Sequence, residues 1–483
     1  MKLKDILKNI DVIETRGSKD IEIKNIRYNS KNVEKGDIFV AIKGESLDGH
    51  NFIDDAITRG ASAVIHQNNR ILPQITDIVV PDSRKALALI SDKFYGYPSK
   101  NLKLIGITGT NGKTTVSYLV KNIIETSGEK AGLMGTISYR IEDESIDASL
   151  TTPESLEIHS FFDKLKKKKA NYAVLEVSSH ALKQNRTYGL KFTSAVFTNI
   201  SRDHLDYHQN MEDYINSKLR LFKQLDDKNS FAVINTDDPV SERIIKITNT
   251  NYIRYSITKK SDIYPLNYNL NFDGISVNVN TPKGNIKINS KLIGYFNINN
   301  ILATVGVGIG LNIDKNIIKE GIEKVEQIPG RAEKLKAGQK FNVIIDYSHT
   351  PDSLLNVISA VKKLTAGDVI AVFGCGGDRD RGKRPLMGKI ASENADIAII
   401  TSDNPRTEDP KKIIEDIAEG IEGIENIILL PDRREAIIKA LSIAEEDDSV
   451  LILGKGHENY QIIGNNRIHF NDKEVALDFL KQM

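Results

Sequence analysis

The sequence predicts an α/β protein built from three domains, and three patterns along the chain support this fold class. Short apolar runs alternate with helical stretches in the middle and at the end of the chain, which is typical of parallel strands buried on both faces. Between Asn251 and Ile293 apolar and polar residues alternate instead, which indicates a small antiparallel insertion. Two Pro/Gly turns separate segments of domain size and place the domains at residues 1–98, 99–329 and 330–483.

The first domain is expected to be a small mixed α/β unit. Its strand-like run GDIFVAI, residues 36–42, is followed by the helical run NFIDDAITRGA, residues 51–61. The turn YGYPSKN at 95–101 ends this domain, and the turn EQIPGRAEK at 326–334 ends the middle one.

The middle domain is predicted to contain a parallel sheet that begins with the apolar run LKLIGI, residues 102–107. A glycine turn and a helical pattern to about Thr126 follow this run. The basic run KLKKKKA at 164–170 lies directly before a strand and is interpreted as the solvated end of a helix, where cations also favour the dipole. Further buried strands are predicted at YAVLE (172–176), SAVFTN (194–199) and FAVIN (231–235).

The last domain repeats the parallel pattern. Its strand runs NVIID, VIAVFG, IAIIT, IILL and SVLILG are separated by helical stretches such as DSLLNVISAVKKL, residues 352–364. In doubly wound sheets, ligands gather at the carboxyl ends of the strands. TSDNPRTEDP at 401–410 and GKGHENY at 454–460 both follow such strand ends, so we expect a binding site there.

Composition narrows the class of protein. The chain has 483 residues, of which 40% are hydrophobic and 27% charged, as in ordinary soluble globular proteins. Its 66 Lys and Arg nearly balance its 65 Asp and Glu, so a net charge of +1 gives no support for nucleic acid or an anionic membrane as the main partner. The single cysteine, Cys375, excludes an intrachain disulfide and a cysteine-rich zinc site. No apolar stretch approaches the roughly 20 residues of a membrane span, and we expect a cytoplasmic enzyme.

The strongest local motif is GITGTNGKTT, residues 106–115, because it follows a strand and opens a helix, as a phosphate-binding loop requires. Backbone N–H groups, the helix N-terminus and Lys113 are expected to cradle phosphate oxygens, and Thr114 to hold Mg²⁺. The spacing departs from G-x-x-x-x-G-K-[ST], because Ile107 stands where the first glycine would be. The loop is therefore a variant that tightens around Gly109.

Candidate Mg²⁺ ligands follow two further strand runs. Glu176 ends the run YAVLE, and the stretch TNISRDHLDYH at 198–208 supplies Asp203, His204 and Asp206. Mg²⁺ prefers oxygen ligands and water. The coincidence of these residues at strand ends with a phosphate loop indicates a nucleotide and magnesium site.

Taken together and in order, these motifs resemble the Mur ligase family, the ATP-dependent amide-forming enzymes of peptidoglycan precursor synthesis. The resemblance covers essentially the whole chain, and the number of ordered matches makes it specific although no single match is. The matching stretches are TGTNGKTT, TTPE (151–154), LEVSSHALKQNR (175–186), TNISRDHLDYH, SKLRLF (217–222), GYFNINNILAT (294–304), PGRAE (329–333), DYSHTPDSL (346–354), GCGGDRDRGKRP (374–385), DNPRTEDP and GKGHENYQ (454–461).

The resemblance implies a UDP-sugar-binding first domain, a P-loop ATPase-like ligase domain in the middle and a Rossmann-like C-terminal domain that binds an amino acid. It implies a reaction that joins a diamino acid to the side-chain carboxylate of D-glutamate in UDP-N-acetylmuramoyl-L-alanyl-D-glutamate, with ATP split to ADP and phosphate. ATP and Mg²⁺ are the implied cofactors, and the partners are these small-molecule substrates rather than nucleic acid or membrane. A monomer is the usual state in the family.

The resemblance also assigns roles to residues. It places catalysis on Lys113, Glu176, His204 and Lys218, and magnesium on Thr114, Glu176, His204 and a carbamoylated Lys218. It implies ATP contacts at Gly109, Thr110, Asn111, Gly112, Lys113, Thr114, Thr115, Asn297, Asn300, Arg331 and Asp346. The UDP-sugar-peptide is expected at Ser30, Thr151, Thr152, Ser178, Gln184 and Arg186. The diamino acid is expected at Arg379, Asp403, Asn404, Pro405, Arg406, Gly454 and Glu458.

One of these assignments differs from what the residue alone would indicate, and another lies where the sequence departs from the family pattern. Without it, Lys218 would be interpreted as a solvated helix lysine. Ser30 is flanked by Asn29 and Lys31 where the family pattern has Asp and Arg, and His50 is a further candidate for the uridine end.

In this family the DNP-R turn distinguishes enzymes that add meso-diaminopimelate from those that add lysine. Diaminopimelate ends in an ammonium and a second carboxylate, which the planar guanidinium of Arg406 can grip with two hydrogen bonds. Glu458 is expected to take the distal ammonium, with Asn404 and Arg379 assisting. Lysine would leave Arg406 unpaired, and a site of this kind can reject such an analogue by about 10⁴-fold. Lanthionine has nearly the same shape and charged ends as diaminopimelate, so the motif leaves both open.

Two other functions, a second ligase and a binding module, compete with this interpretation. A folylpolyglutamate synthetase shares the ligase chemistry, but Glu458 would repel the distal carboxylate of its glutamate. A nucleotide-binding module without turnover would need no metal cluster, so Lys113, Glu176, His204 and Lys218 together argue against it.

Overall fold

The computed structural model describes every residue of the chain except 46, 226–227 and 422–425. The chain divides into two compact units: one comprises Met1–Gly106, Glu129–Ala195 and Ser217–Ser230, and the other comprises Ile107–Gly128, Val196–Asn216 and Phe231–Met483. Among the described residues, every helix is too short or too polar to cross a membrane. The domain boundaries at residues 98 and 329 stay predictions.

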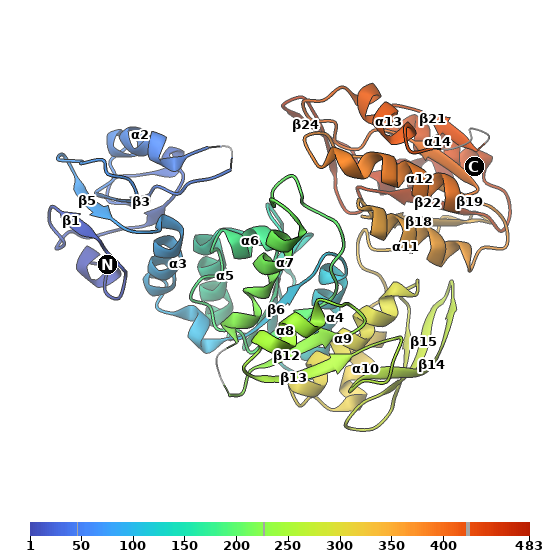
Figure 1. Ribbon diagram of the computed structural model, residues 1–483, viewed down its shortest axis with the longest axis horizontal. Coiled ribbons are helices and arrows are strands. Elements are labelled where there is room, and N and C mark those ends of the chain that lie inside the picture. Colours follow the sequence, from blue (N-terminus) through green and yellow to red (C-terminus); the bar gives the residue numbers. More distant parts are fainter. Residues whose placement is uncertain (46, 226–227, 422–425) are drawn as a thin grey trace. The chain divides into compact units, whose positions relative to one another are not determined.

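A five-stranded sheet forms the core of the N-terminal part (Figure 1). Its order is β1 (Glu14–Arg16), β5 (Thr76–Val79), β4 (Ala63–His66), β3 (Ile38–Val40) and β2 (Ile26–Arg27), parallel except for β1. Helices α1 (Leu3–Ile6) and α3 (Ser83–Phe94) contribute to the core on one face, and α2 (Ile53–Thr58) to that on the other. The expectation of a small mixed α/β unit is confirmed.

The central sheet has eight strands in the order β13-β12-β11-β6-β10-β7-β8-β9. The pairs β10–β7 and β12–β13 are parallel, whereas β7–β8 and β8–β9 form an antiparallel extension that the sequence did not predict. The strands are β6 (Lys103–Thr108), β7 (Ala131–Met134), β8 (Ser138–Ile141), β9 (Glu144–Asp147), β10 (Tyr172–Glu176), β11 (Ser194–Phe197), β12 (Phe231–Asn235) and β13 (Asn251–Tyr255).

The antiparallel insertion starts later than the sequence pattern suggested. Residues Asn251–Tyr255 form β13, which pairs in parallel with β12 in the central sheet. The insertion itself is a three-stranded sheet of β14 (Tyr264–Asn271), β15 (Gly274–Asn280) and β16 (Ile286–Ser290). Alternation alone does not reveal which strand a segment pairs with, and β13 has mixed burial because it lies at a sheet edge.

The helices of the middle part follow the expected pattern. α4 (Lys113–Thr126) packs against α9 (Phe296–Gly310) and α10 (Lys315–Glu323), and Gly321 lies so close to the backbone of Ile123 that a Cβ there would clash. The basic run at 164–170 includes the last turn of α5, as predicted. The remaining helices are α5 (Ser155–Lys167), α6 (Ser179–Lys183), α7 (Met211–Leu219) and α8 (Ser241–Ile247), with short 3-10 helices at Ser30–Asn32, Gly49–Phe52, Pro98–Asn101, Phe222–Gln224 and Arg381–Lys383.

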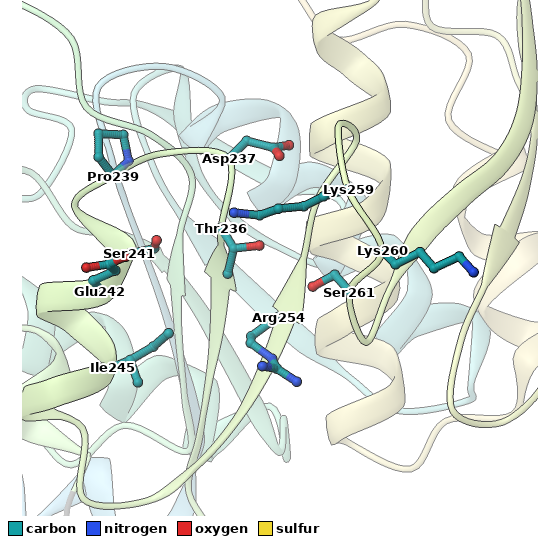
Figure 2. Close-up of a pocket in the computed structure, with 10 residues that line it drawn as sticks. All are labelled: Thr236, Asp237, Pro239, Ser241, Glu242, Ile245, Arg254, Lys259, Lys260 and Ser261. Atoms are coloured by element: carbon teal, nitrogen blue, oxygen red, sulfur yellow. The ribbon is translucent and has the colours of Figure 1, made fainter.

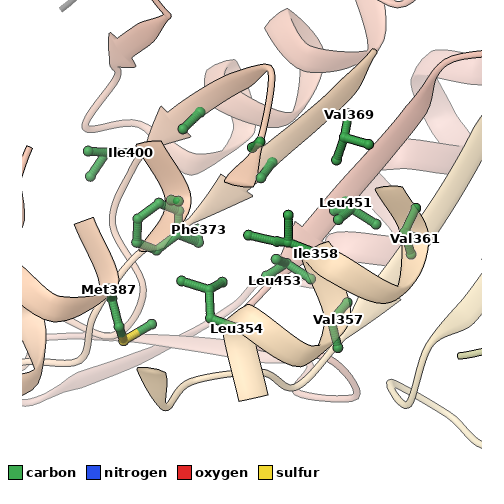
Figure 3. Packing of buried hydrophobic residues seen from close by; sticks show 14 of the residues in the cluster. Leu354, Val357, Ile358, Val361, Val369, Phe373, Met387, Ile400, Leu451 and Leu453 are labelled. Carbon is green, nitrogen blue, oxygen red and sulfur yellow. The ribbon is translucent and has the colours of Figure 1, made fainter. Parts of the chain in front are cut away.

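The C-terminal part is a six-stranded sheet covered by helices on both faces. Figure 3 shows one of the two cores, in which Leu354, Val357 and Ile358 pack against Phe373 and its neighbours. Along β19, alternate side chains enter opposite cores, which explains the continuous apolar run in the sequence. The sheet order is β17 (Glu333–Leu335), β18 (Asn342–Asp346), β22 (Ser449–Leu453), β19 (Val369–Phe373), β20 (Ile397–Ile400) and β21 (Ile427–Leu429).

The covering helices are divided between the two faces. One core contains side chains of α11 (Pro351–Lys362), α12 (Arg384–Asn394) and α13 (Pro410–Ala418), and the other contains side chains of α14 (Arg433–Ile443) and α15 (Asp472–Leu480). In the six-stranded sheet the pairs among β18, β22, β19, β20 and β21 are parallel, whereas β17 pairs with β18 in the antiparallel direction. A hairpin of β23 (Tyr460–Ile463) and β24 (Asn466–His469), which the sequence did not predict, follows β22.

Candidate active site

The phosphate-binding loop has the backbone that its glycines predict. Gly109 and Gly112 both have positive φ, +149° and +86°, and Gly112 caps α4, which begins at Lys113. A Cβ at Gly109 would collide with the hydroxyl of Thr198, and one at Gly112 with Oδ1 of Asn300. Only glycine fits these positions, so the loop is held against the TNISRDH stretch and the start of α9.

Lys113 and Thr114 lie at the start of α4, where backbone N–H groups favour an anion. The ammonium of Lys113 donates to the carbonyls of Gly109, at 3.0 Å, and Thr110, at 2.8 Å. Arg331 Nη2 donates to Thr114 Oγ1 at 3.0 Å. Five of the residues expected to bind ATP are therefore each in contact with another member of the set.

The expected ATP residues of α9 and β18 have defined hydrogen bonds. Asn300 Nδ2 donates to Asn297 Oδ1 at 2.7 Å, and Asn297 Nδ2 donates to the carbonyl of Ile293 at 2.7 Å. Asp346 ends β18 and accepts from the backbone N–H of Ala332 at 2.7 Å. Burial raises the pKa of Asp346 above its ordinary value, although the nearby Arg331 opposes that shift.

His204 is held by its neighbour. Its backbone, at φ +55°, donates to Asp203 Oδ1 at 2.9 Å, and its Nε2 lies 3.2 Å from Asp203 Oδ2. Burial acts to raise the pKa of Asp203, but electrostatic interactions with neighbouring groups, of which His204 is the strongest, lower it to about 2. Asp203 is therefore ionised and orients the imidazole.

Glu176 is buried at the end of β10, as predicted. Thr136 donates to both of its carboxylate oxygens, through its backbone N–H at 3.0 Å and its hydroxyl at 2.7 Å. The hydroxyl of Thr152 donates to the carbonyl of Glu176 at 2.7 Å. This links a predicted metal ligand to the TTPE motif, and Thr136 is a supporting residue that no motif indicated.

Four of the residues expected to bind the UDP-sugar-peptide form one network. Ser178 donates its backbone N–H to Thr152 Oγ1 at 3.0 Å, and Arg186 Nη1 donates to the carbonyl of Thr152 at 2.7 Å. Gln184 Oε1 accepts from Arg186 Nη2 at 2.7 Å. Glu154 lies 3.1 Å from Arg186 Nε, and Arg84 donates to both of its carboxylate oxygens.

Thr151 and Ser30 are less closely tied to this network. Thr151 Oγ1 lies 3.2 Å from Thr136 Oγ1. Ser30 interacts instead with Asp55 and lowers its pKa. His50 bonds to Asp48 at 2.5 Å and accepts from the backbone N–H of Gln67 at 3.2 Å.

Lys218 is not a solvated helix lysine. Only 3% of the residue is exposed, near the end of α7. Among the residues that the structure describes, no three or more His, Cys, Asp or Glu side chains form a metal centre. The magnesium ligands that the resemblance implies instead include the hydroxyl of Thr114 and a carbamoylated Lys218.

The DNP-R turn follows β20 and is fixed by the β23–β24 hairpin. Arg406 has φ +52°, a left-handed conformation uncommon for arginine. Its backbone N–H donates to the carbonyl of Ile462 at 3.0 Å, and its carbonyl accepts from Gly464 at 2.7 Å. Its Nη1 donates to the carbonyl of Gly377 at 2.7 Å. Burial, then the neighbouring Arg379, lowers the pKa of the Arg406 guanidinium from its ordinary value.

Asn404 joins this turn to Glu458. Its Nδ2 donates to Glu458 Oε2 at 2.9 Å, and its Oδ1 accepts from the backbone N–H of Ile462 at 2.9 Å. Lys455, which is fully buried, donates to the same Glu458 oxygen at 2.8 Å. The two strand-end stretches that the sequence predicted to form one site are thus in contact.

The remaining acceptor-site residues lie in the same strand-end loops. Gly454 has φ +111°, and a Cβ there would lie 2.8 Å from Asp403 Oδ2. Arg379 Nη1 donates to the carbonyl of Asp378 at 2.8 Å. A Cβ at Gly377 would collide with the carbonyl of Pro405, so the loop after β19 packs directly on the turn.

A separate pocket of about 460 Å³ lies at the carboxyl ends of β12 and β13 (Figure 2). Figure 2 shows Lys259 extending towards Thr236 and Asp237, whereas Lys260 points in another direction. Arg254 in this pocket is paired with Asp262 at 3.0 Å. The described residues that line the pocket include none of the site residues predicted from the sequence.

Sequence reasoning missed residues that act through others. Glu154 and Lys455 lie inside stretches that were matched to the family, but no role was given to them. Arg433 is fully buried and contacts the strand ends of the acceptor site. The only local signal for Arg433 is its place at the start of a helix capped by Asp432, which does not reveal burial.

The arrangement can bind anions at one strand end and an amino acid at others. The phosphate loop combines backbone donors with the Lys113 ammonium, which suits phosphate groups. The acceptor loops combine the guanidinium of Arg406 with the carboxylate of Glu458, which suits a zwitterion.

Comparison with known families gives three matches in chain order. Residues 22–95 match the Mur ligase family catalytic domain, residues 107–308 the Mur ligase middle domain, and residues 330–456 the Mur ligase glutamate ligase domain.

Individual relatives match over full length. A UDP-N-acetylmuramoyl-L-alanyl-D-glutamate–2,6-diaminopimelate ligase from Clostridium tetani is 46% identical over 490 residues, covering 100% of each chain. A solved structure of a ligase with the same name is 33% identical with a TM-score of 0.69, covering 99% of each chain. A MurF ligase from Thermotoga maritima in complex with ADP shares the fold, with a TM-score of 0.66 at 20% identity over 95% of this chain and 97% of its own. The chain therefore belongs to the Mur ligase family.

Proposed function

We propose that this ligase joins meso-diaminopimelate to the side-chain carboxylate of D-glutamate in UDP-N-acetylmuramoyl-L-alanyl-D-glutamate, at the expense of ATP. The observation that carries the proposal is the contact between the Arg406 turn and Glu458 through Asn404. A guanidinium and a carboxylate at one site fit the second carboxylate and the distal ammonium of the acceptor. The full-length relative from Clostridium tetani carries the name of a 2,6-diaminopimelate ligase, which supports the same substrate.

The reaction has two steps. The glutamate carboxylate attacks the γ-phosphorus of ATP, so that ADP leaves and an acyl phosphate forms. The neutral amine of the acceptor then attacks the acyl carbon, and the tetrahedral intermediate expels phosphate as the amine loses its proton. Both steps gather negative charge, and the Lys113 ammonium at the start of α4 stabilises it.

The expected ATP site draws support from its own contacts. The loop from Gly109 to Thr115 presents backbone N–H groups and a helix N-terminus to the phosphates. Arg331 bonds to Thr114, and the space that a side chain at Gly112 would fill is taken by Asn300, so both lie beside the loop. Asn297 bonds to Asn300, and Asp346 bonds to the backbone beside Arg331. We infer that Asn297 and Asp346 hold Asn300 and Arg331 in place.

Magnesium fits the donors that this chain offers. Thr114 and Glu176 supply oxygens, which Mg²⁺ prefers, and His204 supplies an oriented nitrogen. When bound, the ion neutralises phosphate charge. We propose that these residues hold it together with Lys218.

Carbamoylation of Lys218 is supported by burial. The residue is buried, and reaction of its neutral amine with carbon dioxide would give a carbamate and release one proton. The carbamate presents two oxygens where the amine had none. Lys218→Glu, which keeps a carboxylate, is expected to retain more activity than Lys218→Ala, and equal loss in both would contradict the carbamate.

The UDP-sugar-peptide is proposed to bind beside the network of Thr152, Ser178, Gln184 and Arg186. Thr151 and Ser30 complete the expected set. Because ATP and uridine nucleotides are cytoplasmic substrates, we infer that the enzyme acts in the cytoplasm. We propose a monomer because that is the usual state in the family. Its product would serve cell wall biogenesis and therefore cell shape, cell division and the cell cycle.

The test is phosphate release with ATP, Mg²⁺ and UDP-N-acetylmuramoyl-L-alanyl-D-glutamate, with meso-diaminopimelate, lanthionine or L-lysine as acceptor. Release with diaminopimelate and almost none with lysine is expected. Preference for lysine would overturn the role of Arg406, equal use of lanthionine would widen the substrate class, and silence with all three would overturn the proposed reaction.

A further inference from the structure

Two buried cations of the C-terminal part, Arg433 at the start of α14 and Lys455 in the loop after β22, contact the acceptor loops. The side chains of both are 0% exposed. Burying a charge is unfavourable unless it is paired, and a well-packed apolar pair of similar volume is often as stable as a buried ion pair. Stability alone therefore does not explain why these positions carry charge.

Arg433 bonds to three separate segments. Its Nε and Nη2 donate to the two carboxylate oxygens of Asp472, both at 2.7 Å. Nη2 also donates to the carbonyl of Leu453 at 3.0 Å, and Nη1 donates to the carbonyl of Ser402 at 3.3 Å. The Asp472 carboxylate is also fully buried, so the fork of the guanidinium has one orientation.

The two carbonyls belong to strand ends that are not neighbours. β19 lies between β20 and β22, so the ends of these strands are separated by two strand spacings, about 10 Å. Ser402 directly precedes Asp403, and Leu453 directly precedes Gly454. The guanidinium therefore joins the two acceptor loops at the residues where each loop leaves its strand.

Lys455 joins the same two loops through their side chains. Its Nζ donates to Glu458 Oε2 at 2.8 Å and to Asn404 Oδ1 at 3.3 Å, and it lies 5.4 Å from the centre of the Tyr460 ring. Asn404 Nδ2 donates to the same Glu458 oxygen at 2.9 Å. Because both donors use Oε2, the other oxygen, Oε1, is the one that can accept from a substrate ammonium.

We propose that Arg433 and Lys455 are positioning residues for the acceptor amino acid, which set the spacing between the Arg406 turn and Glu458. This inference rests on the proposed function, since it gives those two residues their ligand. Arg433 fixes the loops at their roots, and Lys455 orients the Glu458 carboxylate. The second carboxylate and the distal ammonium of the acceptor are then met at a fixed separation, so the two buried cations control affinity for the acceptor.

The test replaces each cation by an apolar residue of similar size. Arg433→Met with Asp472→Leu removes the ion pair without leaving a buried charge, and Lys455→Met removes the ammonium. For each variant, kcat and the KM values for acceptor, ATP and the nucleotide-peptide are measured. The KM for meso-diaminopimelate is expected to rise about 10- to 100-fold, as for loss of hydrogen bonds to charged groups, with the other two KM values within about twofold.

A matched control separates positioning from general stability. Ile437 lies on the same helix as Arg433 and is fully buried in the apolar core. Ile437→Ala is expected to lower the melting temperature without changing the acceptor KM. Arg433→Lys, which keeps the charge but cannot bond to Asp472 and both carbonyls in one plane, is expected to give an intermediate acceptor KM.

The outcomes are distinct. The inference would be overturned if the acceptor KM stayed unchanged in both folded variants, Lys455→Met and the double variant. A parallel rise of all three KM values would also overturn it. If the double variant does not fold, Lys455→Met and Arg433→Lys decide it on the same readout. Preference of the wild-type enzyme for lysine would overturn the proposed acceptor but leave the positioning test in force with lysine, whereas absence of acceptor binding to the wild type by calorimetry would overturn both.

Discussion

The phosphate loop and the acceptor site both lie at the carboxyl ends of parallel strands, but they are built in different ways. The phosphate loop uses its own backbone: two glycines with positive φ and the first turn of α4. The acceptor site uses side chains from loops after different strands, and buried groups far along the chain hold these loops together. The first kind of site is specified locally, whereas the second depends on long-range contacts.

The largest expected effect concerns the side chain that is proposed to choose the acceptor. Arg406→Ala removes the guanidinium while leaving a Cβ on the same left-handed backbone, so the strain of that conformation is similar. Preference for meso-diaminopimelate over L-lysine, measured as the ratio of kcat/KM values, is expected to fall by up to about 10⁴-fold.

Arg467→Ala provides the matched control for Arg406. Arg467 lies on the adjoining hairpin, with its guanidinium 3.7 Å from the centre of the Tyr460 ring, and it belongs to no predicted site. Its removal is expected to leave the ratio unchanged. If Arg406→Ala kept the wild-type ratio, the proposed role of this arginine would be wrong.

At the phosphate loop, the largest effect is expected from Lys113→Ala. The ammonium lies over the loop carbonyls, and its loss removes a charge from both proposed steps. A fall in kcat of about 100- to 1,000-fold is expected, with the KM for the acceptor little changed. Lys121→Ala, two turns further along the same helix and paired with Glu125 at 2.5 Å, is the control. A loss below about fivefold in Lys113→Ala would remove Lys113 from the catalytic set.

Gly112→Ala tests the local specification of the loop. Alanine at φ +86° is strained, and its Cβ would collide with Asn300. Gly128 lies at the other end of the same helix with φ +88°, but open space surrounds the position of its Cβ. Gly128→Ala therefore carries the same backbone strain without the collision.

The two glycine variants are compared by thermal unfolding and by ATP affinity. Both are expected to lose about 1–2 kcal/mol of stability from the left-handed backbone, and Gly112→Ala is expected to lose more. Only Gly112→Ala should weaken ATP binding. Equal ATP affinity in the two variants would show that the loop tolerates a side chain.

Features that depend on local patterns could be predicted from the sequence, whereas features that depend on long-range contacts could not. The strand and helix runs, the helix start at Lys113 and the position of Glu176 at a strand end could all be predicted, because each depends on local patterns. The membership of β13 in the parallel sheet could not, because alternation does not identify a pairing partner.

The acceptor site was predicted only in part, for a physical reason. Arg406 and Glu458 were found because their stretches match a family pattern. Arg433 gave no such signal, since a charged residue at the start of a helix is usually solvated and nothing local shows that Asp472 will pair with it in the core. Long-range ion pairs become visible only when the packing is known.

The burial of Lys218 also could not be predicted from its local sequence. A lysine within a helix is ordinarily exposed, and its pattern in the sequence gave no reason to expect burial. In the structure it is 3% exposed. The resemblance singled it out from the motif SKLRLF, whereas elementary chemistry alone would have dismissed it.

The smallest expected effect concerns Glu408, which bonds to the loop that carries Arg379. Glu408 accepts from Arg384 and from the backbone N–H of Asp378, in the loop that carries Arg379. Its hydrogen bond with Arg384 lowers the pKa of Glu408 to about 2, although burial acts in the opposite direction. A carboxyl group with a lowered pKa adds stability above its ordinary pKa, and that contribution is lost as the pH falls towards 2.

Glu408→Gln removes this contribution, so acid unfolding followed by circular dichroism should separate the two proteins. At neutral pH the variant is expected to lose about 0.5–1.5 kcal/mol of stability, and the difference should shrink as the pH falls from about 4.5 towards 2. Glu393→Gln, on the exposed face of α12, is the control and should show almost no difference at any pH. A constant difference between wild type and Glu408→Gln across this range would mean that the carboxylate supports the turn by shape rather than charge. The acceptor turn would then depend on the shape of its supporting side chains more than on their charge, and in this respect the acceptor site would be closer to the phosphate loop.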